Sequence, residues 1–320
     1  MKILVIGGTG HTGSYLVSRL ILEGHDVQVV ARKAEPHYCD PRLGWRKVQW
    51  IIADRRAEEK GDSWQKRMKA LKVDIVIDLI CYTPEQNQIM VGAFEGRIRQ
   101  FLHCGSIWAY GPPRRVPYKE TDPRKPIGQY GYNKARIEEN LLTGFHKNGF
   151  PATVIHPGHI SGRKWLPISP QATRNGVGVY ERLARGETVY LPDDGGSTLH
   201  HVHADDVAQM FLIAIKHPKA ALGESFSAVA SYAMTLLGCC EAVASLFGKE
   251  PNLKFLPLAK MEEVLGKEAF GSTKNHVEHS PSCSIDKAQR LLGYQPSYTT
   301  EEIYRECIEY ILESGQLKLS

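Results

Sequence analysis

Short apolar runs alternate with helical stretches along the first half of this chain. The runs are nearly continuous, which is typical of strands covered on both faces. They lie at residues 3–6, 27–31, 48–53, 75–80, 101–104 and 154–155. A glycine-rich turn after the first run leads into a helix through Leu22, and Gly24 follows where a left-handed residue commonly ends a helix. This alternation predicts a doubly wound α/β fold with a parallel sheet.

The second half of the chain is less regular. Residues 158–197 are rich in loops, with Gly and Pro interrupting the alternation. The pattern then predicts a helix over 204–216 and a last strand of the same sheet over 225–229. From Met234 onward we expect two or three helices, ending in the amphipathic stretch 301–313.

Composition narrows the class of protein. Hydrophobic residues make up 42% and charged residues 23%, as in an ordinary globular chain, and no apolar run approaches the roughly 18 residues of a membrane span. An apolar strand pattern follows Met1-Lys2 at once, without a leader's cleavage site, so we expect a cytoplasmic protein. Seven cysteines without a C-x-x-C pair argue against a disulfide framework or structural zinc. A net charge of +5 is too small to indicate nucleic acid.

The glycine-rich turn has the spacing of a phosphate-binding loop. It follows a strand and opens a helix, so glycines there would let the backbone approach a pyrophosphate at the helix N-terminus. The alternative is a plain tight turn. The predicted cofactor contacts in this loop are Gly7, Thr9, Gly10, His11, Thr12 and Gly13.

Two residues after later strands bear on the choice of cofactor. An NAD site usually places an acidic residue at the end of the second strand, to accept from the ribose hydroxyl. This chain has Arg32 there, with Lys33 beside it, which favours NADP over NAD because a guanidinium can grip a 2′-phosphate. Arg32 as a solvated charge is the alternative. Asp54 is a candidate for the adenine edge, or a helix cap.

A Tyr-x-x-x-Lys pair supplies candidate catalytic residues. In Tyr130-Gly-Tyr-Asn-Lys134 the pair opens a predicted helix and lies on one face, and Ser106 ends the preceding strand. A tyrosine needs a nearby cation to act as a base near neutrality, and we expect Lys134 and an oxidised nicotinamide to supply that charge. Ser106 would hydrogen-bond the substrate oxygen as alcohol and carbonyl interconvert.

These motifs together resemble the short-chain dehydrogenase/reductase superfamily, in its extended or atypical forms. Within it they resemble the NAD-dependent epimerase/dehydratase family. The resemblance runs nearly end to end. It also includes Ser106-Ile-Trp-Ala-Tyr110-Gly111, Pro157, Val202-His203-Ala-Asp205-Asp206-Val207-Ala208, and Asp286-Lys287-Ala288 before Leu292-Gly293-Tyr294-Gln295-Pro296. It implies that Ser106 and Tyr130 act on a sugar or other alcohol. It further implies that Lys134 holds the nicotinamide ribose, with Leu79 and Pro157 as further cofactor contacts.

The resemblance also sets the expected organisation. The expected architecture is a Rossmann doubly wound parallel sheet with a smaller C-terminal α+β lobe that binds the substrate. The NAD(P)-binding domain would comprise residues 1–157 with about 200–230. The substrate-binding lobe would comprise about 158–199 and 231–320.

Departures from the family pattern limit the reaction. Related 4,6-dehydratases carry Asp-Glu where this chain has Ile107-Trp108, which argues against dehydration. Sugar-nucleotide epimerases usually have an arginine at the position of Leu199. His156 stands where another arginine is common. The contacts of these missing arginines with a substrate diphosphate could be made by His156, Arg163 or Arg174 instead. Asp78, where many members have His, resembles the branch of chloroplast stem-loop RNA-binding proteins and keeps a non-catalytic role open.

Several histidines and an aromatic residue are candidates for the substrate pocket. Trp108 follows Ser106 and would line the pocket, or serve as ordinary packing. We expect His159 and His201 to contact substrate as well. No carboxylate at a matching spacing completes a site with His200, His201 and His203, so no metal is expected.

Three functions remain open at this point. The leading hypothesis is an NAD(P)-dependent oxidoreductase of the epimerase type, moving hydride at a secondary alcohol or ketone of a sugar or nucleotide-sugar-like substrate, with Tyr130 as acid and base. The alternatives are an NADPH-dependent reductase of a small carbonyl compound, and a non-catalytic dinucleotide- or RNA-binding protein. We expect a small molecule as the binding partner and no association with a membrane. Nucleic acid is the least favoured of the partners considered. Ile137, Leu141 and Leu142 could form a homodimer face or belong to the core.

Overall fold

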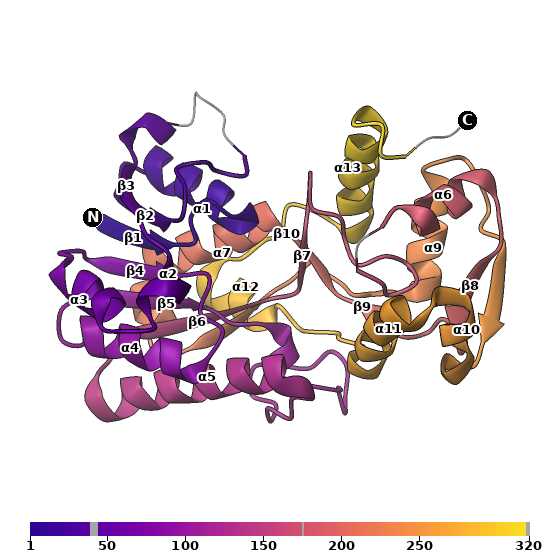
Figure 1. Cartoon of the computed structure of the whole chain (residues 1–320). Helices are drawn as coiled ribbons and strands as arrows, with labels where there is room; N and C mark the ends of the chain where they lie inside the picture. Colours follow the sequence, from indigo (N-terminus) through magenta and orange to yellow (C-terminus); the bar gives the residue numbers. More distant parts are fainter. Residues whose placement is uncertain (39–43, 175, 318–320) are drawn as a thin grey trace.

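The computed structural model describes residues 1–38, 44–174 and 176–317. Its centre is a seven-stranded sheet, parallel throughout, with the order β11-β6-β5-β4-β1-β2-β3 (Figure 1). The strands are β1 (Lys2–Ile6), β2 (Asp26–Ala31), β3 (Gln49–Ile52), β4 (Ile75–Asp78), β5 (Gln100–Cys104), β6 (Ala152–Pro157) and β11 (Ser225–Ala228). The doubly wound parallel sheet predicted from the sequence is therefore confirmed, including its late completion by β11.

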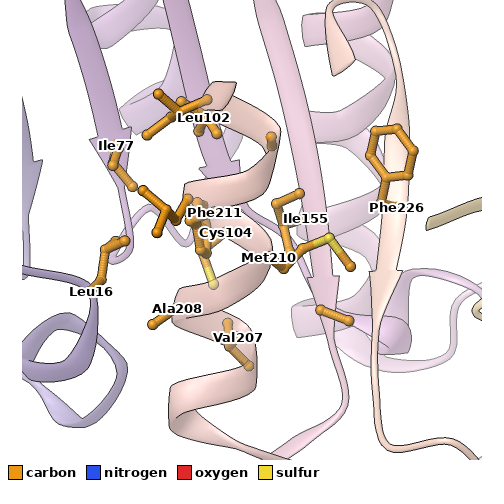
Figure 2. Close-up of a cluster of buried hydrophobic side chains, with 14 of the residues drawn as sticks. Leu16, Ile77, Leu102, Cys104, Ile155, Val207, Ala208, Met210, Phe211 and Phe226 are labelled. Carbon is orange, nitrogen blue, oxygen red and sulfur yellow. The ribbon is translucent and has the colours of Figure 1, made fainter. Parts of the chain in front are cut away.

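Alternate residues of each strand feed two separate apolar clusters. In β1, Ile3 and Val5 face one cluster and Leu4 and Ile6 the other, and all four are fully buried. Helices α1 (His11–Leu22) and α7 (Ala204–Lys216) cover the first face, and Figure 2 shows α7 lying across the strands there. The second face is covered by α3 (Ser63–Ala70), α4 (Pro84–Phe94) and α5 (Gly128–Asn148).

A smaller lobe beside the sheet has its own apolar core (Figure 1). Three two-stranded ribbons pair β10 with β7, β12 with β9 and β13 with β8. Their bounds are β7 (His159–Ser161), β8 (Val189–Pro192), β9 (Thr198–Leu199), β10 (His201–His203), β12 (Met234–Thr235) and β13 (Leu253–Leu256). The helices of the lobe are α6 (Gly178–Arg185), α9 (Leu236–Ser245), α10 (Met261–Leu265), α11 (Lys267–His279) and α13 (Thr300–Glu313). In the sheet half lie α2 (Arg55–Glu58), α8 (Pro218–Ala221) and α12 (Asp286–Leu292), which packs against α8 and β11.

The expectation of two or three helices after Met234 was wrong, because α9 to α13 are all present in the described residues. The helices α10 and α12 have five and seven residues, too few to show a helical period in the sequence. Residues 158–197 contain β7, α6 and β8 between their loops. Within the described ranges, no helix combines the length and apolar character of a membrane span.

Candidate active site

The glycine loop after β1 has a backbone that only glycine permits at two positions. Gly7 has a φ of 84°, and a Cβ added to Gly13 would lie 2.5 Å from the Gly7 carbonyl oxygen. The absence of a side chain at Gly13 lets the start of α1 pack directly against the loop. Gly10 is the N-cap residue of α1, so the first amide groups of the helix stand beside the loop.

A cavity of about 350 Å³ opens beside this loop. Thr9 and Gly10 line it together with Arg32, which follows β2, and with Asp54 and Arg56, which follow β3. Asp54 also accepts a hydrogen bond from the Ala57 amide at 3.2 Å and so caps α2, which was the alternative weighed for it. A glycine cradle continuous with a basic cavity fits the adenosine and phosphate part of a dinucleotide. Sequence reasoning missed Arg56, which comes two residues after Asp54.

The remaining predicted cofactor contacts occupy other positions. His11 and Thr12 are buried, and the His11 ring stacks on Trp165 with centroids 5.2 Å apart. Burial lowers the pKa of His11 to about 3, so its imidazole is neutral. Leu79 follows β4 directly and Pro157 ends β6, both at the carboxyl edge of the sheet where the resemblance placed them.

The three candidate catalytic residues meet at the carboxyl ends of β4 and β5. Ser106 comes two residues after β5, and its Oγ accepts a hydrogen bond from the Trp108 amide at 3.2 Å. Lys134 is 1% exposed, and its Nζ donates to the main-chain oxygens of Cys81 at 2.8 Å and Cys104 at 2.6 Å. Nζ lies 5.8 Å from the centre of the Tyr130 ring, in the first turn of α5. Since an ammonium has three protons, these two bonds leave one for a ligand.

The protein environment does not lower the pKa of Tyr130 as the sequence analysis expected from Lys134. Burial raises the pKa of Tyr130 to about 12, and the Cys104 thiol adds to this effect. The Ser106 hydroxyl and the Arg174 charge act in the opposite direction without cancelling it. With its pKa raised by burial, Tyr130 is a protonated phenol near pH 7 in the protein alone. The Lys134 ammonium donates to two main-chain carbonyls.

A buried network fixes the main chain at Ser106. His156, at the end of β6, accepts from the Ser106 amide through Nδ1 at 3.0 Å, and its Nε2 lies 3.1 Å from a Glu138 oxygen. Glu138 projects from α5 and also accepts from Arg124, through Nε at 2.7 Å and Nη2 at 2.5 Å. Burial raises the pKa of the Glu138 carboxyl, but His156 and Arg124 outweigh it and hold the pKa well below its usual range.

A group of aromatic and imidazole rings lies next to Ser106. The Trp108 ring is 9% exposed, and its centroid lies 5.2 Å from that of His276 and 3.4 Å from that of His279. His159 lies 5.1 Å from His276. His201 lies one ring further, 5.6 Å from His159. The candidates Trp108, His159 and His201 are thus brought together, while His276 and His279 come from α11, where no motif spacing pointed to them.

The three side chains that could replace the missing arginines have different surroundings. His156 is occupied by Ser106 and Glu138, and Arg163 pairs with Glu313 on α13. Arg174 forms no hydrogen bond or ion pair within the described residues, and burial lowers its pKa. Its charge lowers the pKa of Tyr130. Of the three, Arg174 alone keeps its guanidinium available.

Other residues singled out in the sequence have structural contacts. Asp78 is fully buried and bonds the Arg55 guanidinium through both oxygens at 2.9 Å. His200 contacts the Ala230 carbonyl and His203 the Glu306 carboxylate, both at 2.9 Å. In the part of the chain that the structure describes, no three His, Cys, Asp or Glu side chains are grouped as a metal ion requires.

The proposed homodimer residues on α5 lie mainly in the interior. Ile137 and Leu141 are fully buried in the apolar cluster under α5, and Leu142 packs against the same cluster. The core alternative therefore describes Ile137 and Leu141, while Leu142 is partly exposed at the edge of the same cluster.

Together the parallel sheet, the glycine loop and the residues at its carboxyl edge define a dinucleotide-binding α/β protein. The chain belongs to the NAD dependent epimerase/dehydratase family, which matches residues 3–228. It is 26% identical over 329 residues to a UDP-glucose 4-epimerase of Lacticaseibacillus casei, covering 93% of this chain and 92% of that protein.

Two further comparisons mark the range of relatives. A chloroplast stem-loop binding protein of 41 kDa (b) from Arabidopsis thaliana is 26% identical over 311 residues, covering 94% of this chain and 76% of that protein. The crystal structure of UDP-glucose 4-epimerase from Thermotoga maritima with UDP-glucose superimposes with a TM-score of 0.71 at 22% identity, covering 98% of this chain and 99% of that one. The structural likeness shows a shared fold.

Proposed function

We propose that this protein transfers hydride between NAD(P) and a secondary alcohol or ketone of a sugar or nucleotide-sugar-like substrate, as in an epimerase cycle. The observation that carries the proposal is the meeting of Ser106, Tyr130 and Lys134 at one edge of the sheet, beside the glycine loop. Family membership and the UDP-glucose 4-epimerase relative support the same class of reaction.

Each of the three side chains has a distinct role in this proposal. The third Nζ proton of Lys134 binds a ribose hydroxyl of the dinucleotide, whose nicotinamide ring supplies or accepts the hydride when bound. Tyr130 moves a proton to or from the substrate oxygen, and Ser106 donates a hydrogen bond to that oxygen. The His156–Glu138 pair holds the Ser106 main chain in place for this contact.

We assign the cofactor preference to NADP. Arg32 and Arg56 line the cavity beside the glycine loop, and within the described residues neither guanidinium forms an ion pair. Two guanidinium groups are suited to a 2′-phosphate, which a carboxylate at this position would repel. The proposed division follows the sequence: residues 1–157 with about 200–230 bind the dinucleotide, and about 158–199 with 231–320 bind the substrate.

A simple NADPH-dependent reductase of a small carbonyl compound is the second candidate. Two observations favour it: Leu199 is fully buried where epimerases usually carry an arginine, and Arg163 is held by Glu313. The raised pKa of Tyr130 also suits a residue that donates a proton to a reduced carbonyl.

Identifying the dinucleotide released from freshly purified, acid-quenched protein tests these functions. Oxidised cofactor retained near stoichiometry supports the epimerase cycle, and its identity decides between NADP and NAD. Protein that is purified empty and binds NADPH reversibly supports the reductase. Failure to bind any nicotinamide dinucleotide would contradict both, and RNA filter binding at low salt would then test a role like that of the stem-loop binding relative.

A further inference from the structure

Four buried imidazoles beside the candidate catalytic residues have nitrogen atoms without partners. His159, His201, His276 and His279 are each at most 5% exposed. The atoms without a hydrogen bond are both ring nitrogens of His159, Nδ1 of His201, and Nε2 of His276 and His279. Buried polar atoms in a folded protein are nearly always hydrogen-bonded, so such a cluster calls for a ligand.

The partners of the other ring nitrogens fix what kind of ligand fits. Nδ1 of His276 lies 2.7 Å from the Ser272 carbonyl and Nδ1 of His279 lies 2.8 Å from the Asn275 carbonyl. A carbonyl only accepts, so each Nδ1 carries the proton. Burial lowers the pKa of both imidazoles to about 4, so they are neutral near pH 7. The free Nε2 atoms are therefore hydrogen-bond acceptors, which bind a donor and not an anion.

Arg174 provides donors at the same place. Ser272 Oγ on α11, one turn before His276, donates to the Ala172 carbonyl at 3.2 Å, two residues before Arg174. The Arg174 charge lowers the pKa of Tyr130, His159 and His276. The segment that carries it is fastened to α11, since Thr273 Oγ1 donates to the Gln171 carbonyl at 2.9 Å. The helix that presents His276 thus also positions the loop that presents Arg174.

We propose that His276 and Arg174 form a subsite for a substrate hydroxyl group next to the reacting carbon. The hydroxyl proton is donated to Nε2 of His276, and the hydroxyl oxygen accepts from the Arg174 guanidinium. This assignment rests on the proposed function, because it places the reacting carbon at Tyr130 and Ser106.

A site with the acceptor Nε2 of His276 on one side and the donor guanidinium of Arg174 on the other favours a hydroxyl group in the substrate. A hydroxyl both donates and accepts, whereas a carbonyl or carboxylate lacks the proton that His276 requires and a methyl group satisfies neither side. An analogue without the hydroxyl leaves the buried Nε2 of His276 unpaired, at a cost of roughly 1–3 kcal/mol, or about 5- to 150-fold in kcat/KM. His276 and Arg174 would therefore be specificity-determining residues.

The protonation of His276 can be measured without knowing the substrate. Long-range ¹H–¹⁵N spectra of the dinucleotide-loaded protein report which nitrogen carries the proton, and glycerol is added as a probe with 1-propanol as its control. We expect an unprotonated Nε2 whose resonance moves with glycerol but not with 1-propanol, while the exposed His146 stays unchanged. A proton on Nε2, or an equal response to both alcohols, would overturn the proposal.

Turnover supplies the second measurement. Two pairs of compounds differ in the hydroxyl beside the carbonyl: dihydroxyacetone with acetone, and glyceraldehyde with propanal. Wild-type protein should favour the hydroxylated member of each pair by about 5- to 150-fold. His276→Phe, which keeps a ring without the acceptor, should abolish that preference, while His146→Phe on the surface of α5 keeps it. Equal use of both members by the wild type would refute the subsite. Absence of turnover with every compound would count against the small-carbonyl reductase instead, and the spectra would still decide on the subsite.

Discussion

Tyr130 is the side chain on which the proposed proton transfer depends. Tyr130→Phe keeps the ring and removes the hydroxyl, so kcat should fall by about 10²- to 10⁴-fold, as when a general acid or base is removed. Dinucleotide affinity should stay unchanged, because Lys134 and the glycine loop are untouched. Steady-state kinetics and a fluorescence titration with NADPH measure the two effects. The matched control is Tyr132→Phe, two residues along and 64% exposed, and equal activity of both variants would exclude the role of Tyr130.

In the proposed cofactor site, the charge of Arg32 sets the preference for NADP over NAD. Arg32→Ala removes a charge-assisted contact to the 2′-phosphate, worth about 1.5–3 kcal/mol, so NADP affinity should fall at least about tenfold. NAD has no such phosphate and should bind as before. Calorimetric titration of both cofactors measures the difference, with Arg136→Ala on the exposed side of α5 as control. Wild-type protein that prefers NAD would show the assignment of Arg32 to be wrong.

Side chains that follow strands were within reach of sequence reasoning, and those on irregular segments were not. Ser106, Tyr130 and Lys134 sit at the end of a strand and the start of a helix, where the topology of a parallel sheet brings them together. Arg174 lies in a loop and His276 on a polar helix of the lobe, so only the folded chain shows that His276 packs against Trp108 and that the Arg174 charge acts on Tyr130. The lowering of the Tyr130 pKa by Lys134 together with an oxidised nicotinamide stays a prediction, since in the protein alone burial raises that pKa.

At the scale of elements, α5 joins catalysis to stability. It carries Tyr130 and Lys134, and one turn further Glu138, which ties α5 to β6 through His156. The sequence predicted that the Tyr130–Lys134 pair opens a helix, without giving its bounds. The bounds of α7 were predicted correctly over residues 204–216, because that helix is long and amphipathic. The short helices α10 and α12 gave no such signal.

The Glu138 carboxylate should make stability depend on pH. Its pKa in the folded state lies below the unfolded value near 4.3, so the folded state gains stability above that pH and loses it on acidification. Glu138→Gln should lower the free energy of unfolding by about 3 kcal/mol at neutral pH and flatten the loss in acid. Urea unfolding across pH measures both.

The neighbouring residue provides the control for that measurement. Glu139 pairs with Arg136 on the surface with its side chain 61% exposed, so Glu139→Gln should change stability by less than about 0.5 kcal/mol. If the two variants have the same pH dependence, the buried network is not the source of the acid sensitivity.

At the scale of the whole molecule, Asp206 joins the sheet half to the segment that enters α13. Its carboxylate accepts from the Ser297 amide at 2.7 Å and the Tyr298 amide at 3.2 Å. Asp206→Ala leaves both donors unpaired and should cost roughly 2–4 kcal/mol in urea unfolding. Asp205→Ala breaks a more exposed pair with Arg19, so its cost should be nearer 1 kcal/mol. Equal costs would show that Asp206 does not hold the lobe.

The order of the strands along the chain has a consequence for synthesis. β11 pairs with β6 although residues 158–224 lie between them in the sequence. During synthesis, one edge of β6 therefore has no strand partner until all of these residues and β11 have left the ribosome. Every residue of β6 is buried in the finished sheet, and an open apolar edge pairs readily with other chains. A fragment cut after residue 157 should therefore aggregate, which means that the dinucleotide half cannot be produced alone unless β11 is supplied to it.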